Sequence, residues 1–255
     1  MDIEALRSKT ALSQRKDRAL LAGFFLLGLV LGTCLYVLGP ELPSEDRAVL
    51  LTLPTTPEAM AGTILVAERY TEARPTYVRV CLAFLYVFLQ TFAIPGPLLL
   101  SILSGALFGF TEGFVTVCLC ATLGACCCYI LAGSLGKGLV LRWFPQMLLR
   151  FHQGIEEHRH DLLWYLLFLR ITPLLPNWFI NVASPLVGVP LPTFALATFL
   201  GIMPGNVIHV NVGVTIASVK SLHAIQLKHV AILLGLGVLA LLPTFCRRRY
   251  GKKFA

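Results

Sequence analysis

Long apolar stretches alternate with short polar ones along this chain of 255 residues. Residues 19–38, 114–133 and 193–219 are each long enough to cross a hydrocarbon core about 30 Å thick as a helix. A fourth stretch, residues 229–243, is shorter, but basic residues that can anchor at lipid headgroups follow it directly. The pattern predicts an all-α polytopic membrane protein with about four full transmembrane helices.

Two further apolar regions, at about residues 77–111 and 162–190, are interrupted in their middles. The interruptions are Pro95, Gly96 and Pro97 in the first region and Pro173 and Pro176 in the second. Proline removes a backbone donor that a continuous helix needs, so we expect each region to turn. The arms of the first region, 80–94 and 98–110, are somewhat short for a full crossing. Both regions are therefore predicted to be re-entrant helical hairpins.

Composition supports a membrane location. Hydrophobic residues make up 56% of the chain, charged residues only 13%, and the mean hydropathy is +0.77. A chain this apolar exceeds what one soluble core can bury. The net charge of +8 does not indicate a nucleic-acid partner, because the basic residues gather near the chain ends and in one central loop.

The basic residues also predict the orientation. Five Lys or Arg lie within residues 1–18 and five within residues 246–255, so the positive-inside rule places both ends in the cytosol. Residues 19–38 exceed the length of a signal-peptide core, and no small-residue cleavage site follows, so we expect an uncleaved anchor. With four crossings, the first hairpin opens from the lumen and the second from the cytosol. The expected divisions are residues 1–75 (cytosolic start, anchor and lumenal segment), 76–243 (membrane domain) and 244–255 (basic cytosolic tail).

Polar residues within the apolar regions are the candidate functional groups. Arg170 inside a membrane costs about 2.5–3.5 kcal/mol on insertion scales, so it should face a polar interior. Asn177, Asn181 and Ser184 follow it at i, i+4, i+7 spacing, which places them on one face of a helix. The remaining candidates are Gln90, Ser101 and Ser104 at the first hairpin and Asn206 and His209 beside Pro204. Together with Pro95, Gly96, Pro173 and Pro176 of the two turns, these residues are predicted to line a hydrophilic cleft. Two alternatives stay open: the polar groups hold the helices together, and Arg170 reaches the cytosolic interface.

The two hairpins share a short pattern. FLQ at 88–90 precedes Pro95, FLR at 168–170 precedes Pro176, and a full span follows each hairpin. Broken helices that meet from opposite sides of the membrane are typical of transporters with inverted repeats. We therefore expect an inverted repeat.

The chain shows no pattern typical of a cofactor, metal or nucleotide site. Five of its eight cysteines, between 118 and 128, lie within an apolar span without C-x-x-C spacing, so a packing role is expected. GSLGKG at 133–138 lacks the spacing of a phosphate-binding loop. No catalytic constellation is visible, so an enzyme is not predicted.

The motifs FLQTFAIPG, LSILSG and VCLC, with FLRITPLLPNWFIN in the second half, resemble the DedA superfamily of VTT-domain, or SNARE-associated Golgi, proteins, and within it the eukaryotic transmembrane protein 41 group, the stasimon branch. The resemblance covers about residues 76–243. It implies an endoplasmic-reticulum protein that scrambles phospholipids between leaflets without ATP and supports autophagosome formation, with autophagy and lipid-transfer proteins as partners. Bacterial relatives carry a membrane acid and two arginines. Here Gln90 stands at the position of the acid and only Arg170 matches the arginines, which disfavours proton coupling.

Three functions follow as hypotheses. The first is an ATP-independent phospholipid scramblase, the second a proton- or ion-coupled transporter of small solutes, and the third a membrane scaffold. Lys252 and Lys253 give the last four residues the K-K-x-x form that cytosolic coat proteins read as a retrieval address to the endoplasmic reticulum. The alternative for this lysine pair is simple anchoring at the headgroups.

Overall fold

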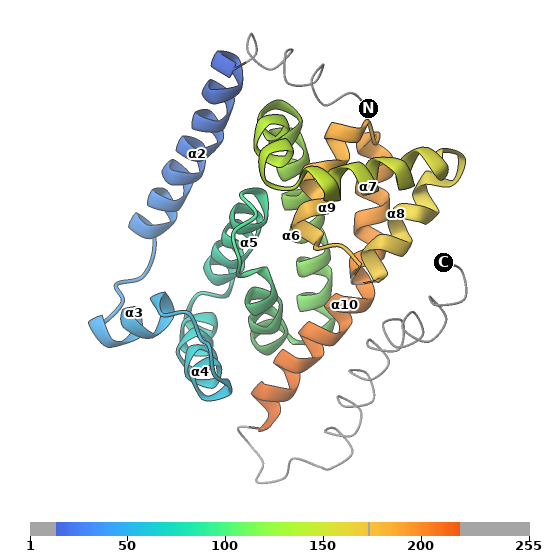
Figure 1. Ribbon diagram of the computed structural model, residues 1–255. Helices are drawn as coiled ribbons and strands as arrows, with labels where there is room; N and C mark the ends of the chain where they lie inside the picture. The colour runs from blue at the N-terminus through green and yellow to red at the C-terminus, as the bar shows by residue number, and fades with distance from the viewer. Residues whose placement is uncertain (1–13, 173, 220–255) are drawn as a thin grey trace.

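The computed structural model describes residues 14–172 and 174–219, and within these residues the fold is all-helical, as predicted (Figure 1). The elements, in chain order, are α2 (Gln14–Val37), α3 (Ser44–Leu51), α4 (Pro57–Ala73), α5 (Pro75–Thr91), α6 (Pro97–Trp143), α7 (Pro145–Glu157), η1 (Arg159–Asp161), α8 (Leu162–Ile171), α9 (Asn177–Ala183), η2 (Ser184–Val187) and α10 (Leu191–Val219).

Proline marks where several of these helices begin. The first residue of α4, α5, α6 and α7 is a proline in each case, namely Pro57, Pro75, Pro97 and Pro145 in that order. At this position the missing N–H would have no partner inside the helix, and the fixed φ angle already suits helical backbone. The same residue type that interrupts an apolar region therefore also sets the start of the next helix.

The first interrupted region forms two helices joined by a tight turn. α5 ends at Thr91 and α6 begins at Pro97, with Ala93 at φ 54° and Gly96 at φ 148° in between. Positive φ angles reverse the chain within few residues, and glycine adopts them without a steric penalty. The Tyr86 hydroxyl and Ser101 Oγ, 3.1 Å apart, form a hydrogen bond across the two arms. The predicted turn lies where the sequence places it.

α6 continues well beyond this hairpin. We predicted residues 98–110 as a hairpin arm and 114–133 as a separate span, whereas the structure joins both in one helix with a single break at Gly109 (φ 73°, ψ −178°). The two segments join because residues 110–114 contain no proline, so helical backbone resumes at once. Arg79 of α5 forms an ion pair with Glu112, three residues after the break.

The second interrupted region also forms a helix, a turn and a helix. α8 ends at Ile171, α9 begins at Asn177, and η2 then leads through Gly188 (φ 78°) into α10. Pro173 lies outside the described residues. Pro204 lies inside α10 without ending it.

The two longest helices, α6 and α10, pack against each other in the middle of the bundle (Figure 1). Glycines allow their backbones to approach closely: a methyl group at Gly105 would lie 2.1 Å from the Val210 carbonyl oxygen, and one at Gly213 would lie 1.8 Å from that of Ile102. Close crossings of this kind are typical of helix packing in membranes. α7 and α8 lie at one end of the bundle and α3 and α4 at the other, while α2 lies at its edge (Figure 1).

Two helices among the described residues are long and apolar enough to cross a membrane, namely Pro97–Ser134 within α6 and Leu191–Ser218 within α10. The apolar part of α2, Ala22–Val37, is shorter. Leu119 and Leu123 on α6 are each 57% exposed, as expected for side chains that face lipid. The fourth predicted span, residues 229–243, and the tail with Lys252 and Lys253 lie outside the described residues.

Candidate polar cavity between the two turns

A cavity of about 420 Å³ lies where the α5–α6 turn, the end of α8, the start of α9 and the middle of α10 meet. Eight of the residues predicted to line a cleft do line this cavity: Gln90, Pro95, Ser101, Arg170, Asn177, Asn181, Asn206 and His209. They come from parts of the chain more than a hundred residues apart. Apolar groups complete its walls, among them Ile94, Leu98, Trp178 and Ile202. The cavity therefore joins apolar walls with a few polar groups, as ligand sites commonly do.

Arg170 is the charged group of this cavity. Its side chain is only 7% exposed and is held by three neutral acceptors. Nη2 donates to Asn181 Oδ1 at 2.7 Å and to Thr198 Oγ1 at 2.8 Å, and Nη1 donates to Asn177 Oδ1 at 3.3 Å. The guanidinium carbon lies 5.0 Å from the centre of the Phe194 ring, within cation–π range.

The local sequence explains how Arg170 acquires these partners. α8 ends one residue after Arg170, and the turn before Asn177 carries the chain back across the end of α8. Asn177 and Asn181 lie one helical turn apart on α9, so both side chains reach the same guanidinium. α10 supplies Thr198, which shares Nη2 with Asn181. The predicted spacing of the two asparagines thus lets both of them contact Arg170.

The guanidinium keeps donor capacity toward the cavity. It has five N–H groups, and three of them donate to acceptors in the described part of the chain. No aspartate or glutamate is among the described residues that line the cavity. Because arginine remains charged at physiological pH, the cavity carries a positive charge. Its neutral hydrogen-bond partners stabilise this charge but do not cancel it. Such a site favours an anion with several acceptor oxygens.

Gln90 and Arg170 occupy equivalent helix crossings. A methyl group at Gly124 of α6 would lie 2.6 Å from the Gln90 Cβ, and one at Gly201 of α10 would lie 2.4 Å from the Arg170 Cβ. Each polar side chain therefore leaves its helix where a glycine of the following long helix makes room. Both side chains line the cavity. An inverted repeat would produce such a shared contact, and the repeat itself stays a prediction from FLQ and FLR.

Other predicted site residues lie elsewhere. Ser104 and Ser184 are fully buried, and their hydroxyls donate to the Gly113 and Ile180 carbonyls, so they stabilise backbone away from the cavity. Gly96 lines a different cavity, on the opposite side of the α5–α6 turn. Pro176 precedes α9 and does not line the polar cavity. For Ser104 and Ser184 the interpretation as packing groups describes the geometry better.

Sequence reasoning missed two polar residues beside the cavity. Thr198 accepts a hydrogen bond from Arg170, and Tyr86, 3% exposed, lines the wall beside Ser101. Helical spacing could have indicated both, because Tyr86 lies four residues before Gln90 and Thr198 eleven before His209. Among the five cysteines between 118 and 128, Cys118 accepts a hydrogen bond from Asn206 Nδ2 at 3.5 Å. No cluster of three or more His, Cys, Asp or Glu occurs among the residues that the structure describes.

Comparison with known proteins places the chain in a family. Residues 94–215 match the model of the VTT domain. Human transmembrane protein 41B is 37% identical over 95% of this chain and 83% of its own length. The transmembrane protein 41 homolog of Drosophila melanogaster is 38% identical over 94% of this chain and 75% of its own length. No solved structure matches the chain. This chain therefore belongs to the transmembrane protein 41 family of VTT-domain membrane proteins, in the DedA superfamily.

Proposed function

We propose that this multi-pass membrane protein is a phospholipid scramblase that works without ATP. The observation that carries the proposal is Arg170, a buried cation on neutral partners, in the wall of a cavity between two membrane-capable helices. A phosphate in hydrocarbon is very costly, and a cation with unused donors lowers that cost. The arginine fork suits phosphate better than a point charge does.

In this proposal the headgroup moves through the polar cavity while the acyl chains stay in lipid. Arg170 binds the phosphate, and Gln90, Asn177 and His209 replace part of the water that the headgroup loses. Asn181 and Thr198 keep the guanidinium in place during passage. Because the cavity offers the same groups to a headgroup from either leaflet, movement is passive and runs in both directions.

The cavity lining favours this function over proton-coupled transport. A proton-coupled carrier needs a group that exchanges protons within the pathway, and membrane carboxylates are common in that role. His209 is the only ionisable side chain besides Arg170 and Tyr86 among the described residues that line the cavity. A gradient-dependent transporter therefore remains the second candidate, with His209 as its proton-exchanging group.

The cellular setting is also part of the proposal. We propose residence in the endoplasmic reticulum with both termini in the cytosol, four crossings and two re-entrant hairpins, on the basis of loop charges and the family resemblance. Lys252 and Lys253 would then be read by coat proteins in the cytosol. Autophagosome formation and lipid export are the processes that this activity would support.

Purified protein in liposomes tests the activity. Liposomes carry a fluorescent phospholipid in both leaflets, and a membrane-impermeant reductant bleaches the outer one. Without scrambling about half of the fluorescence survives, and an active scramblase lets nearly all of it be lost, with no ATP and no pH gradient. Bleaching that stops at half under these conditions contradicts the proposal. Activity that appears only with a pH gradient selects the second candidate.

A further inference from the structure

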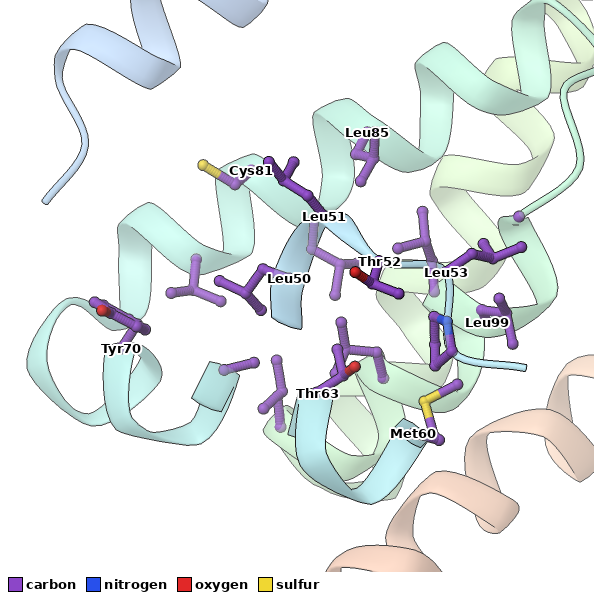
Figure 2. Close-up of a pocket in the computed structure, with 18 of the residues that line it drawn as sticks. Leu50, Leu51, Thr52, Leu53, Met60, Thr63, Tyr70, Cys81, Leu85 and Leu99 are labelled. Carbon is purple, nitrogen blue, oxygen red and sulfur yellow. The ribbon is translucent and has the colours of Figure 1, made fainter. Parts of the chain in front are cut away.

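A second cavity, of about 480 Å³, lies between the α3–α4 segment and the first hairpin (Figure 2). Figure 2 shows Leu50, Leu51 and Leu53, from the end of α3 and the connection to α4, together with Leu85 of α5 and Leu99 of α6 around this space. Met60 and Thr63 of α4 close a further side. Three parts of the chain thus enclose one space, and none of the predicted functions accounts for it.

The lining of this cavity is almost entirely hydrocarbon. The hydroxyl groups that border it already donate to the protein: Thr63 to the Ala59 carbonyl at 3.1 Å, Thr52 to the Ala48 carbonyl at 2.7 Å, and Tyr70 to Asp46 Oδ2 at 2.7 Å. The hydrogen bond to Asp46 also raises the pKa of the Tyr70 hydroxyl. A ligand there gains contact with leucine and methionine side chains and finds few donors. The lining therefore selects a long apolar group.

The rim of the cavity indicates where that group comes from. Leu51 and Leu53 are 80% and 62% exposed, although both line the cavity. Exposed leucines around an apolar opening are unfavourable in water and mark a surface that something apolar covers. In a multi-pass membrane protein the most abundant apolar group within reach is a lipid chain.

The two cavities meet at one residue. Pro95, in the α5–α6 turn, lines both the apolar cavity and the polar cavity of Arg170. The turn therefore separates a hydrocarbon-lined space from a cationic one. A phospholipid is the class of molecule that combines an acyl chain with a phosphate, and so matches both sides of the turn.

We propose that the apolar cavity binds one acyl chain of a membrane phospholipid. The acyl chain lies between α4, α5 and α6 and packs against Leu99 and Met60. It supports the α5–α6 turn from the side opposite the polar cavity. The inference rests on the proposed function only for the choice of a phospholipid, since chain binding is measured without any transport.

Photolabelling of the full-length protein in liposomes tests this site. The probe is a phosphatidylcholine with a diazirine near the end of one acyl chain, and labelled peptides are mapped by mass spectrometry. Met60 is only 5% exposed and lines the cavity, so a label there reports a chain inside it rather than lipid around the protein. We expect a label at Met60 in the wild-type protein. A protein labelled on α6 at Leu123 but not at Met60 overturns the proposal.

Two variants make the test specific. Leu99→Trp fills the cavity, whereas Leu123→Trp adds the same ring to a position on α6 that is 57% exposed and lines neither cavity. Leu99→Trp should lower the Met60 label roughly tenfold, a loss of about 1.4 kcal/mol in binding free energy, and Leu123→Trp should not change it. Equal labelling in both variants contradicts the site.

A second filling variant and two further probes complete the design. If Leu99→Trp does not fold, Ala67→Phe from α4 fills the cavity from the other wall. A photoreactive sterol that labels Met60 better than the phospholipid does, or a Met60 crosslink to another segment of this chain, overturns the choice of occupant. If Met60 is labelled in liposomes that do not scramble, the acyl-chain site stands and the proposed function is refuted. If the liposomes scramble but Met60 is not labelled, the proposed function stands and the acyl-chain site is refuted.

Discussion

The side chains of Arg170 and Asn181, eleven residues apart in the chain, are joined by a 2.7 Å hydrogen bond from Nη2 to Oδ1. Both residues are buried, at 7% and 1% exposure. A guanidinium in this position is stabilised by dipoles rather than by an opposite charge, so its field extends into the cavity. The first two predictions use this property.

Arg170→Leu should slow phospholipid scrambling at least about tenfold, equivalent to about 1.4 kcal/mol in the barrier for passage. The variant removes the only cation among the described cavity residues and leaves the Asn177 and Asn181 carbonyls without their donor. Arg170→Lys should retain part of the rate, because the charge survives without the planar fork. The liposome bleaching assay measures both. Arg150→Leu, at an exposed position on α7, is the matched control, and wild-type rates in Arg170→Leu would refute the role of Arg170.

Gln90→Glu should make scrambling dependent on pH. When ionised, the new carboxylate lies in the same cavity as Arg170 and offsets its charge, so phosphate binding weakens. When protonated at lower pH, it resembles glutamine and the rate should recover toward the wild-type value. A rate–pH profile of the variant against wild type checks this sign. Gln153→Glu, exposed on α7, should show the wild-type profile, and an equally flat profile for Gln90→Glu would contradict the prediction.

Gly201→Ala should destabilise the protein by about 1–3 kcal/mol, because the added methyl group overlaps the Arg170 side chain. Gly205→Ala is the matched comparison on the same helix. A methyl group there meets no atom within 4 Å, and alanine favours helix by about 0.5–1 kcal/mol over glycine. Thermal unfolding in detergent should therefore give a lower midpoint for the first variant and an equal or higher one for the second. Equal midpoints would mean that α8 shifts freely against α10.

Replacing Lys252 and Lys253 with serine, while keeping Arg247, Arg248 and Arg249, should release the protein toward the Golgi. The three arginines survive in this variant, so the orientation that the positive-inside rule predicts should stay the same. Fluorescence microscopy with a protease-protection assay separates location from orientation. Unchanged residence in the endoplasmic reticulum would assign retention to another part of the chain.

Local signals in the sequence predicted the parts of the site that local chemistry determines. Pro95, Gly96 and Pro97 mark the first turn, and Asn177 and Asn181 lie on one helical face as their spacing requires. Contacts between distant segments could not be predicted in this way. Thr198 meets Arg170 only because α10 packs against α8, and the apolar cavity depends on where α3 and α4 lie against the first hairpin.

Two serines were predicted to line the cleft and do not line the cavity. Ser104 and Ser184 are polar residues in apolar segments, as the cleft residues are, yet their hydroxyls donate to backbone carbonyls. A hydroxyl can satisfy itself on nearby backbone, whereas a guanidinium or an amide needs several partners from other elements. Large polar groups in an apolar segment are therefore the better guide to a shared cavity.

The break at Gly109 divides α6 into two arms. The first arm begins just after the turn with Pro95, and the break lies three residues before Glu112, which pairs with Arg79 of α5. Both partners are more than 40% exposed, so dissolved ions screen their attraction. This ion pair therefore contributes little to the position of the first arm, and the close approach of Gly105 and Ile102 to α10 holds that arm instead.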